Sequence, residues 1–127
     1  KSISGTSVQT QWETPTGGGS LPYTSYEAIF SSTGGNVSVV EANNTTGTTF
    51  TWVDSGNEIV IRPAVAFGDQ PVLVLLNGYG GTKDSKALCF FGGYLKANGQ
   101  VTIDKLDRDF ASTVADIAQG NFELRVY

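Results

Sequence analysis

Histidine and methionine are both absent from this 127-residue sequence, and cysteine occurs only once. Histidine is the commonest general base and the commonest transition-metal ligand in proteins, so the usual centres of hydrolytic and metal chemistry are missing. The single cysteine, Cys89, has no partner for an internal disulfide, and its apolar neighbours at residues 87–91 predict a buried small side chain. Because no nucleophile–base pair is present, we expect this chain not to be an enzyme.

Charge and long hydrophobic runs are scarce as well. Charged residues make up 16% of the chain, the net charge is −4 and the pI is about 4.5. A chain of this sign repels phosphate, which argues against a nucleic-acid partner for this domain. No apolar run reaches the roughly 18 residues that a membrane-spanning helix requires, so we expect no membrane insertion.

Short hydroxyl side chains and glycine take the place of charge. The sequence holds 14 threonines, 11 serines and 16 glycines. Threonine favours pleated strands and glycine favours the turns between them. This composition predicts a β-rich protein with a polar but weakly charged surface.

The segment QWETPTGGGSLP, residues 11–22, divides the chain. Its two prolines remove backbone donors and its three consecutive glycines add backbone entropy, so no regular element is expected there. We therefore predict an initial strand and tether over residues 1–22, followed by one β-rich domain over residues 23–127.

Short runs of alternating or β-branched residues recur along the second region. Asp54-Ser55-Gly56-Asn57 is a strong turn signal, so the runs on either side of it predict a β-hairpin. A continuously apolar run at residues 72–76 predicts a strand that is buried on both faces or that faces another subunit. The predicted strands cover residues 26–30, 36–40, 48–53, 58–62, 72–76, 88–94, 100–103 and 122–126, and residues 41–47 are expected to form an exposed loop.

One segment departs from this pattern. Between residues 107 and 119, Phe110, Val114 and Ile117 recur at helical spacing, Asp104 or Asp107 is placed to cap the N-terminus, and Gly120 is placed to cap the C-terminus. The predicted fold is therefore all-β, a single antiparallel β-sandwich or jelly-roll-like barrel with one short helix near the C-terminus.

An aspartate cluster precedes that helix. Asp104, Asp107 and Asp109 place three carboxylates within six residues, and calcium prefers several such oxygens. Helix capping, with Lys105 and Arg108 balancing the charge, explains the same residues. Calcium is the only cofactor for which the sequence offers candidate ligands.

Candidate ligand contacts are amides and aromatic rings. Asn43 and Asn44 begin glycosylation sequons in the polar segment. Tyr79 lies in a glycine-rich turn signal, and Trp52 offers a second aromatic surface; exposed aromatic faces among hydroxyls and amides are suited to sugar rings. Tyr23 and Tyr26 are further aromatic candidates.

The chain begins with a Ser/Thr/Gly/Pro-rich segment, and a compact β domain follows that ends at Phe122-Glu123-Leu124-Arg125-Val126-Tyr127. This arrangement resembles a known one. It is similar to the C-terminal protruding domain of small icosahedral RNA-virus capsid proteins of the nodavirus and tombusvirus type. The resemblance lies in the composition and order of segments along the whole chain. No receptor-binding residue of those families can be aligned with this sequence. It implies self-association as a dimer or trimer, attachment to a host receptor or glycan, and a place on the virion surface.

Two other hypotheses remain open. The chain fits a carbohydrate-binding or adhesive β-sandwich module of a bacterial surface or secreted protein, located outside the cell or on its surface. It would fit a small hydrolase only if two carboxylates act as a catalytic pair, and the sequence does not single out such a pair.

Overall fold

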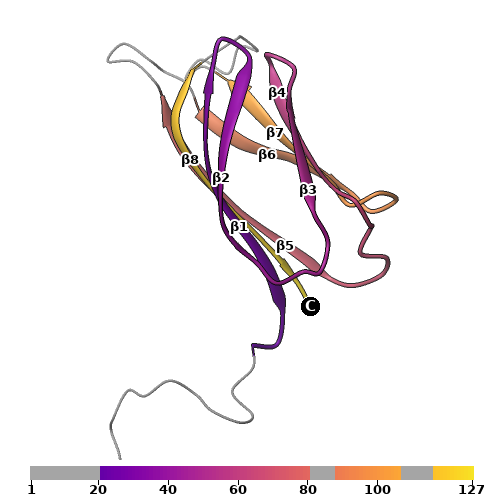
Figure 1. The fold of residues 1–127 in the computed structure, drawn as a ribbon. Coiled ribbons are helices and arrows are strands. Elements are labelled where there is room, and N and C mark those ends of the chain that lie inside the picture. Colours follow the sequence, from indigo (N-terminus) through magenta and orange to yellow (C-terminus); the bar gives the residue numbers. More distant parts are fainter. Residues whose placement is uncertain (1–20, 81–87, 107–115) are drawn as a thin grey trace, which may run out of the picture.

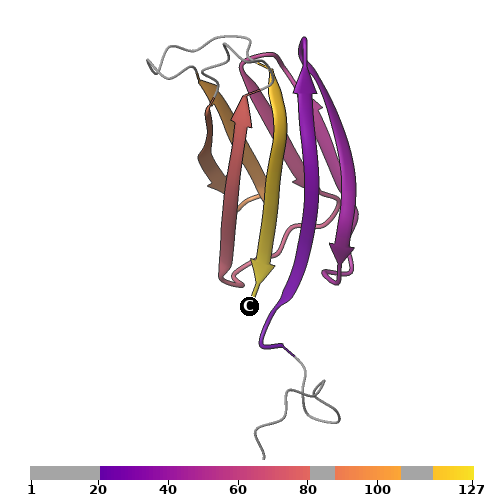
Figure 2. The same cartoon turned by 90° about the vertical axis from the view of Figure 1, so that its left-hand side faces the viewer.

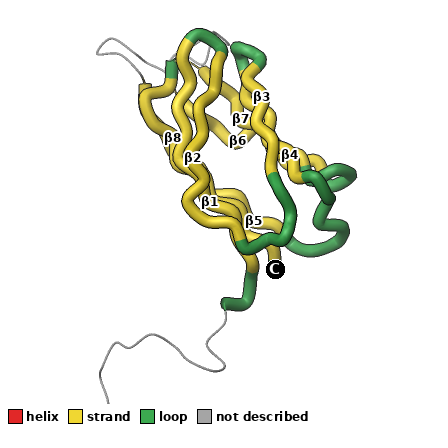
Figure 3. Tube along the Cα trace, in the orientation of Figure 1, coloured by secondary structure: helices red, strands yellow, loops and turns green. Residues whose placement is uncertain are grey.

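The computed structural model of this protein describes residues 21–80, 88–106 and 116–127, so nearly all of the predicted tether lies outside the described residues. Across these three ranges the chain forms eight β-strands and no helix (Figures 1 and 3). The strands are β1 (Thr24–Thr33), β2 (Asn36–Asn44), β3 (Phe50–Asp54), β4 (Glu58–Pro63), β5 (Val72–Gly80), β6 (Leu88–Leu95), β7 (Gln100–Leu106) and β8 (Ile117–Val126).

The strands build two layers. Sheet A has the order β2-β1-β8-β5 and sheet B has the order β3-β4-β7-β6, with antiparallel pairing throughout. Figure 2 shows sheet A face-on, with β5 at one margin and β2 at the other. The prediction of an antiparallel β-sandwich is confirmed, as two separate four-stranded sheets.

The core lies between the two sheets and is supplied by their central strands. Alternate residues of β1, β8, β4 and β7 point inward, as the period of two in a strand requires. Edge strands contribute partly buried side chains, because one flank of an edge strand is open. The buried apolar residues are Tyr26, Ala28, Phe30, Ile59, Ile61, Val101, Ile103, Ile117, Phe122, Leu124 and Val126.

The predicted hairpin around Asp54-Ser55-Gly56-Asn57 is confirmed by the pairing of β3 with β4. Gly56 adopts a φ of 97°, and its amide donates to Asp54 Oδ1 at 2.9 Å. The left-handed backbone conformation at this position favours glycine, because glycine has no Cβ to clash with the backbone.

The prediction of a C-terminal helix is wrong where the structure describes it. Residues 107–115 lie outside the described residues, but Ile117 to Gln119 belong to strand β8. Gly120 is not a helix cap: it lies inside β8 opposite Phe30, and a Cβ there would lie 2.1 Å from the Phe30 ring. Pairing with strands distant in the sequence overrode the local helical spacing, since strand formation depends more on context than on propensity.

Two strand predictions also change. The polar segment after residue 40 does not begin as a loop, because β2 continues to Asn44 along the ten-residue strand β1. The apolar run at residues 72–76 is not buried on both faces: Val72, Val74 and Leu76 pack against the core, whereas Leu73 and Leu75 are 40% and 41% exposed.

Candidate functional site

The outer face of sheet A carries a hollow of about 410 Å³. Two neighbouring rows of the sheet build it. In the first row Asn43, Glu27, Glu123 and Leu75 are successive partners across β2, β1, β8 and β5, and in the second row Val40, Ile29, Asn121 and Asn77 are successive partners. Side chains that point away from the core therefore meet at the centre of the sheet, where Glu27, Ile29, Leu75, Asn77, Asn121 and Glu123 line the hollow.

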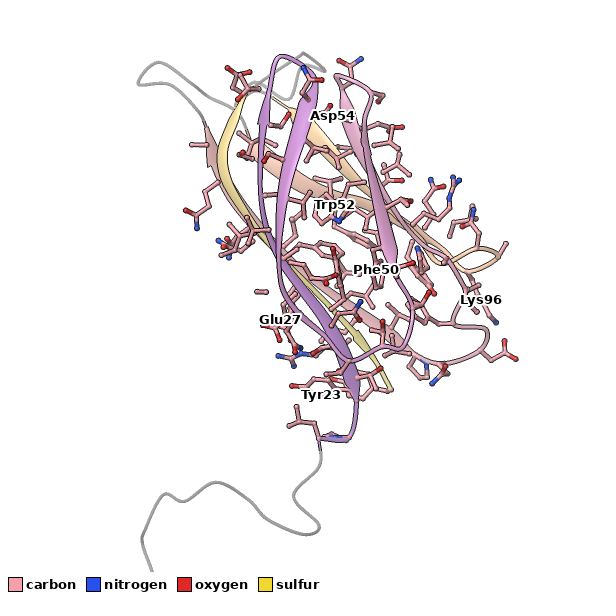
Figure 4. The ribbon with its side chains drawn as sticks, in the orientation of Figure 1. Tyr23, Glu27, Phe50, Trp52, Asp54 and Lys96 are labelled. Atoms are coloured by element: carbon pink, nitrogen blue, oxygen red, sulfur yellow. The ribbon has the colours of Figure 1, made fainter. Side chains whose placement is uncertain are left out.

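Two carboxylates lie side by side at the centre of this hollow. Glu27 and Glu123 are cross-strand partners, and directly opposed side chains in antiparallel sheets have Cβ atoms about 4.5–5.5 Å apart. Arg125 Nε donates to Glu123 Oε2 at 2.6 Å, and Asn43 Nδ2 lies 3.4 Å from Glu27 Oε2. Each carboxylate is therefore positioned by its own donor, and Figure 4 shows Glu27 on the side of β1 away from sheet B.

Amide groups continue the hollow beside the carboxylates. Asn121 Nδ2 donates to Asn77 Oδ1 at 2.6 Å, and Gln119 Nε2 donates to Asn121 Oδ1 at 3.3 Å. Ile29 and Leu75, which are 45% and 41% exposed, provide apolar surface next to these amides. The hollow thus combines fixed acceptors and donors with small apolar patches.

The structure places one predicted ligand residue beside the hollow and the other away from it. Asn43 Nδ2 donates to Ser25 Oγ at 3.0 Å, which holds this amide against β1 next to Glu27. Asn44 instead closes the following turn: its Nδ2 donates to Thr48 O at 2.8 Å and its Oδ1 accepts from Thr46 N at 3.0 Å.

The aromatic candidates separate into core and surface residues. Trp52 is half-buried between the sheets, where its Nε1 donates to the Tyr26 hydroxyl at 2.9 Å and its ring lies 5.6 Å from that of Phe122 (Figure 4). Tyr26 is only 2% exposed, so its ring offers no free face to a sugar. Tyr23 lies under the Arg125 guanidinium at 4.7 Å, and the Tyr79 backbone pairs with Gln119 of β8.

The aspartate cluster is described only in part. Asp104 lies on β7, and its carboxylate fills the space in front of Gly92, where a Cβ would be 2.8 Å away. Asp107 and Asp109 lie outside the described residues. Within residues 21–80, 88–106 and 116–127, no group of three His, Cys, Asp or Glu side chains is arranged to hold a metal ion.

A second polar feature lies buried between the sheets, at the end of the sandwich opposite the C-terminus. Lys105 Nζ donates to Asp54 Oδ1 at 2.8 Å and to Ser32 Oγ at 2.9 Å, and Ser32 Oγ donates to Asp54 Oδ2 at 2.5 Å. The side chains of Lys105 and Asp54 are 0% and 1% exposed. We call these three residues the inter-sheet cluster, since Ser32 belongs to sheet A and the other two belong to sheet B.

The inter-sheet cluster is built for support rather than for reaction. A serine beside a lysine resembles a nucleophile with its base, but a base must be neutral and its serine must be reachable by substrate. Burial alone would raise the pKa of Asp54, yet hydrogen bonds from Lys105, Ser32 and the Gly56 amide together hold that pKa below its ordinary value. The buried Lys105–Asp54 ion pair thus belongs to sheet B, and hydrogen bonds of Ser32 link it to sheet A.

The sequence did not predict this cluster, because Lys105 was expected to balance the charge of the aspartates that cap a helix. A usable signal was present in the alternation of Val101, Ile103 and Lys105, which places the lysine on the inward face of β7.

The described residues contain no helix long and apolar enough to cross a membrane. No protein-family model, curated protein or solved structure matches this chain.

Proposed function

We propose that this chain is a non-catalytic attachment module that binds a glycan in the hollow on the outer face of sheet A. The observation that carries the proposal is the combination of Glu27, Glu123, Asn77 and Asn121 around one surface hollow of about 410 Å³. Sugar hydroxyls both donate and accept hydrogen bonds, so a site for them needs both kinds of partner held in place.

The chemistry of the hollow favours recognition over turnover. The carboxylates of Glu27 and Glu123 accept hydrogen bonds from hydroxyls, and the amides of Asn77 and Asn121 offer donors and acceptors. Ile29 and Leu75 give apolar surface for the C–H faces of a sugar ring. Arg125 and Asn43 already hold the carboxylates, so a ligand meets positioned groups and little ordering is required on binding.

For the setting of this module we propose a projection on an icosahedral viral capsid, with attachment to host cells as its role. A surface or secreted bacterial protein is the alternative setting, and a β-sandwich suits both. The complete open reading frame that encodes this chain separates them. A shell domain preceded by a basic arm supports the capsid, whereas a signal peptide with further modules contradicts it.

A printed array of oligosaccharides tests the binding itself. We expect the fluorescently labelled chain to bind a subset of glycans and the Asn77→Ala/Asn121→Ala variant to lose at least about tenfold in affinity, since unpaired polar groups are costly. Arg62→Ala, an exposed change on sheet B, is the matched control and should bind like the wild type. Absence of any glycan signal, or equal loss in both variants, would overturn the proposal.

A further inference from the structure

The hollow on the outer face of sheet A lies in a sheet with an excess of negative charge. The four strands of this sheet hold three carboxylates, Glu27, Glu41 and Glu123, but a single cation, Arg125. Two of these carboxylates, those of Glu27 and Glu123, line the hollow. The charge of a group that enters the hollow therefore affects how tightly it binds.

The only cation on these strands is already engaged. Arg125 Nε donates to Glu123 Oε2 at 2.6 Å, and the guanidinium lies 4.7 Å from the centre of the Tyr23 ring. A carboxylate and an aromatic ring are both favourable partners for a guanidinium. An acidic ligand would have to compete with Glu123 for Arg125.

Glu27 has no cation to compensate its charge. Within the described part of the chain, its Oε2 accepts from two neutral groups at long range, Ser25 Oγ at 3.5 Å and Asn43 Nδ2 at 3.4 Å. No ion pair among residues 21–80, 88–106 and 116–127 includes Glu27. The other cations in these ranges belong to sheet B or to the turn after β6, and they are Arg62, Lys96 and Lys105.

We infer that the hollow selects glycans that carry no acidic group, and that Glu27 is the residue that rejects a carboxylate or a sulfate. This inference rests on the proposed glycan binding. Asn121 is a diagonal cross-strand neighbour of Glu27, and such neighbours lie about 7–8 Å apart. An acidic group in contact with Asn121 therefore stays within about one Debye length of Glu27, which is about 8 Å at physiological salt.

The same carboxylate attracts an uncharged sugar. A hydroxyl that donates to a carboxylate forms a charge-assisted hydrogen bond, which is about twice as strong as a neutral one. In the described part of the chain, hydrogen bonds reach only Oε2 of Glu27, so its Oε1 is open to a ligand. Glu27 thus favours a hydroxyl and repels an anion at the same place.

Sets of immobilised glycans that differ only in a terminal acid test the selectivity. Each uncharged oligosaccharide is printed beside its sialylated and its sulfated form, and the affinity of the labelled chain is measured for all three. We expect the wild type to bind the uncharged form at least about tenfold more tightly, because like charges about 5 Å apart repel near a protein surface. Glu27→Gln keeps the shape of the side chain and should reduce that preference at least about threefold.

The matched control is Glu58→Gln, which makes the same change in net charge on β4 of sheet B and should keep the wild-type preference. Salt gives a second reading that a merely structural role of Glu27 would not move. The wild-type preference should shrink as sodium chloride rises from about 0.01 M to about 1 M, because the Debye length falls from about 30 Å to about 3 Å. The preference of Glu27→Gln should change less.

The outcomes separate this inference from the proposed function. Equal or tighter binding of the acidic forms, a preference that salt does not change, or the same preference in the wild type and Glu27→Gln would overturn the inference and leave glycan binding in place. Absence of binding to every printed glycan would overturn the proposed function and the inference together.

Discussion

At the scale of single residues, we expect substitutions in the inter-sheet cluster to lower the free energy of unfolding strongly. Breaking a buried ion pair leaves an unpaired charge in a medium of low dielectric constant, whereas an exposed pair is compensated by water. The chain contains both kinds, since the Lys105–Asp54 pair is buried and the Lys96–Asp69 pair is 65% and 93% exposed.

Replacing Lys105 by methionine should therefore lower the free energy of unfolding by about 3–5 kcal/mol, because Asp54 keeps its charge and loses its cation. Lys96→Met makes the same chemical change at the surface and should alter stability by less than about 1 kcal/mol. Urea denaturation of both variants measures the two effects. Equal, small losses would show that water reaches Asp54 and that the cluster is not closed.

The same cluster predicts sensitivity to acid. The folded-state pKa of Asp54 lies below its ordinary value, so its contribution to stability is complete above that ordinary value and is lost as the pH falls through the depressed pKa. We expect the urea midpoint to fall as the pH drops below about 4, and to fall less in Asp54→Asn, which lacks the titrating group. Parallel pH curves for the two proteins would contradict this assignment.

At the scale of elements, Gly120 allows a side chain of β1 to pack directly against the backbone of β8. Phe30 and Gly120 are cross-strand partners, and the Phe30 ring occupies the place of a Cβ on Gly120. Glycine inside a strand often marks such a contact, although it weakens the strand in isolation. The residue is thus required by packing and not by the helix end that local spacing predicts.

Gly120→Ala should destabilise the fold by about 1–3 kcal/mol, since the added methyl group forces the Phe30 ring to move. Shortening the ring to leucine should relieve part of that clash. A double-mutant cycle with Phe30→Leu, followed by thermal unfolding, should show favourable coupling between the two changes. Additive losses would mean that Gly120 and Phe30 do not compete for the same space.

The sequence predicts where strands occur better than it predicts which strands lie next to each other. Alternation identified most strands, and the glycine-containing turn at residue 56 correctly joined β3 to β4. The order of strands within a sheet is set by contacts between distant segments, which local patterns do not contain. The hollow therefore could not be predicted, because Glu27 and Glu123 become neighbours only when β1 pairs with β8. For the same reason the contact between the Trp52 indole and Phe122 of the opposite sheet could not be predicted.

At the scale of the whole molecule, the two faces of the sandwich have different roles. The inner faces hold the apolar core and the inter-sheet cluster, while the outer face of sheet A gathers amides, carboxylates and exposed apolar side chains around one hollow. Glycan attachment through the outer face of sheet A is the role that we propose for this surface.

The most direct measurement is an NMR map of the amide shifts that change when the strongest glycan from the array is added to the labelled chain. The largest changes should cluster on the outer face of sheet A, at Glu27, Asn121 and Glu123, with those of sheet B unchanged. Changes centred on sheet B, or none with any glycan tested, would contradict the assignment of the hollow as the binding site.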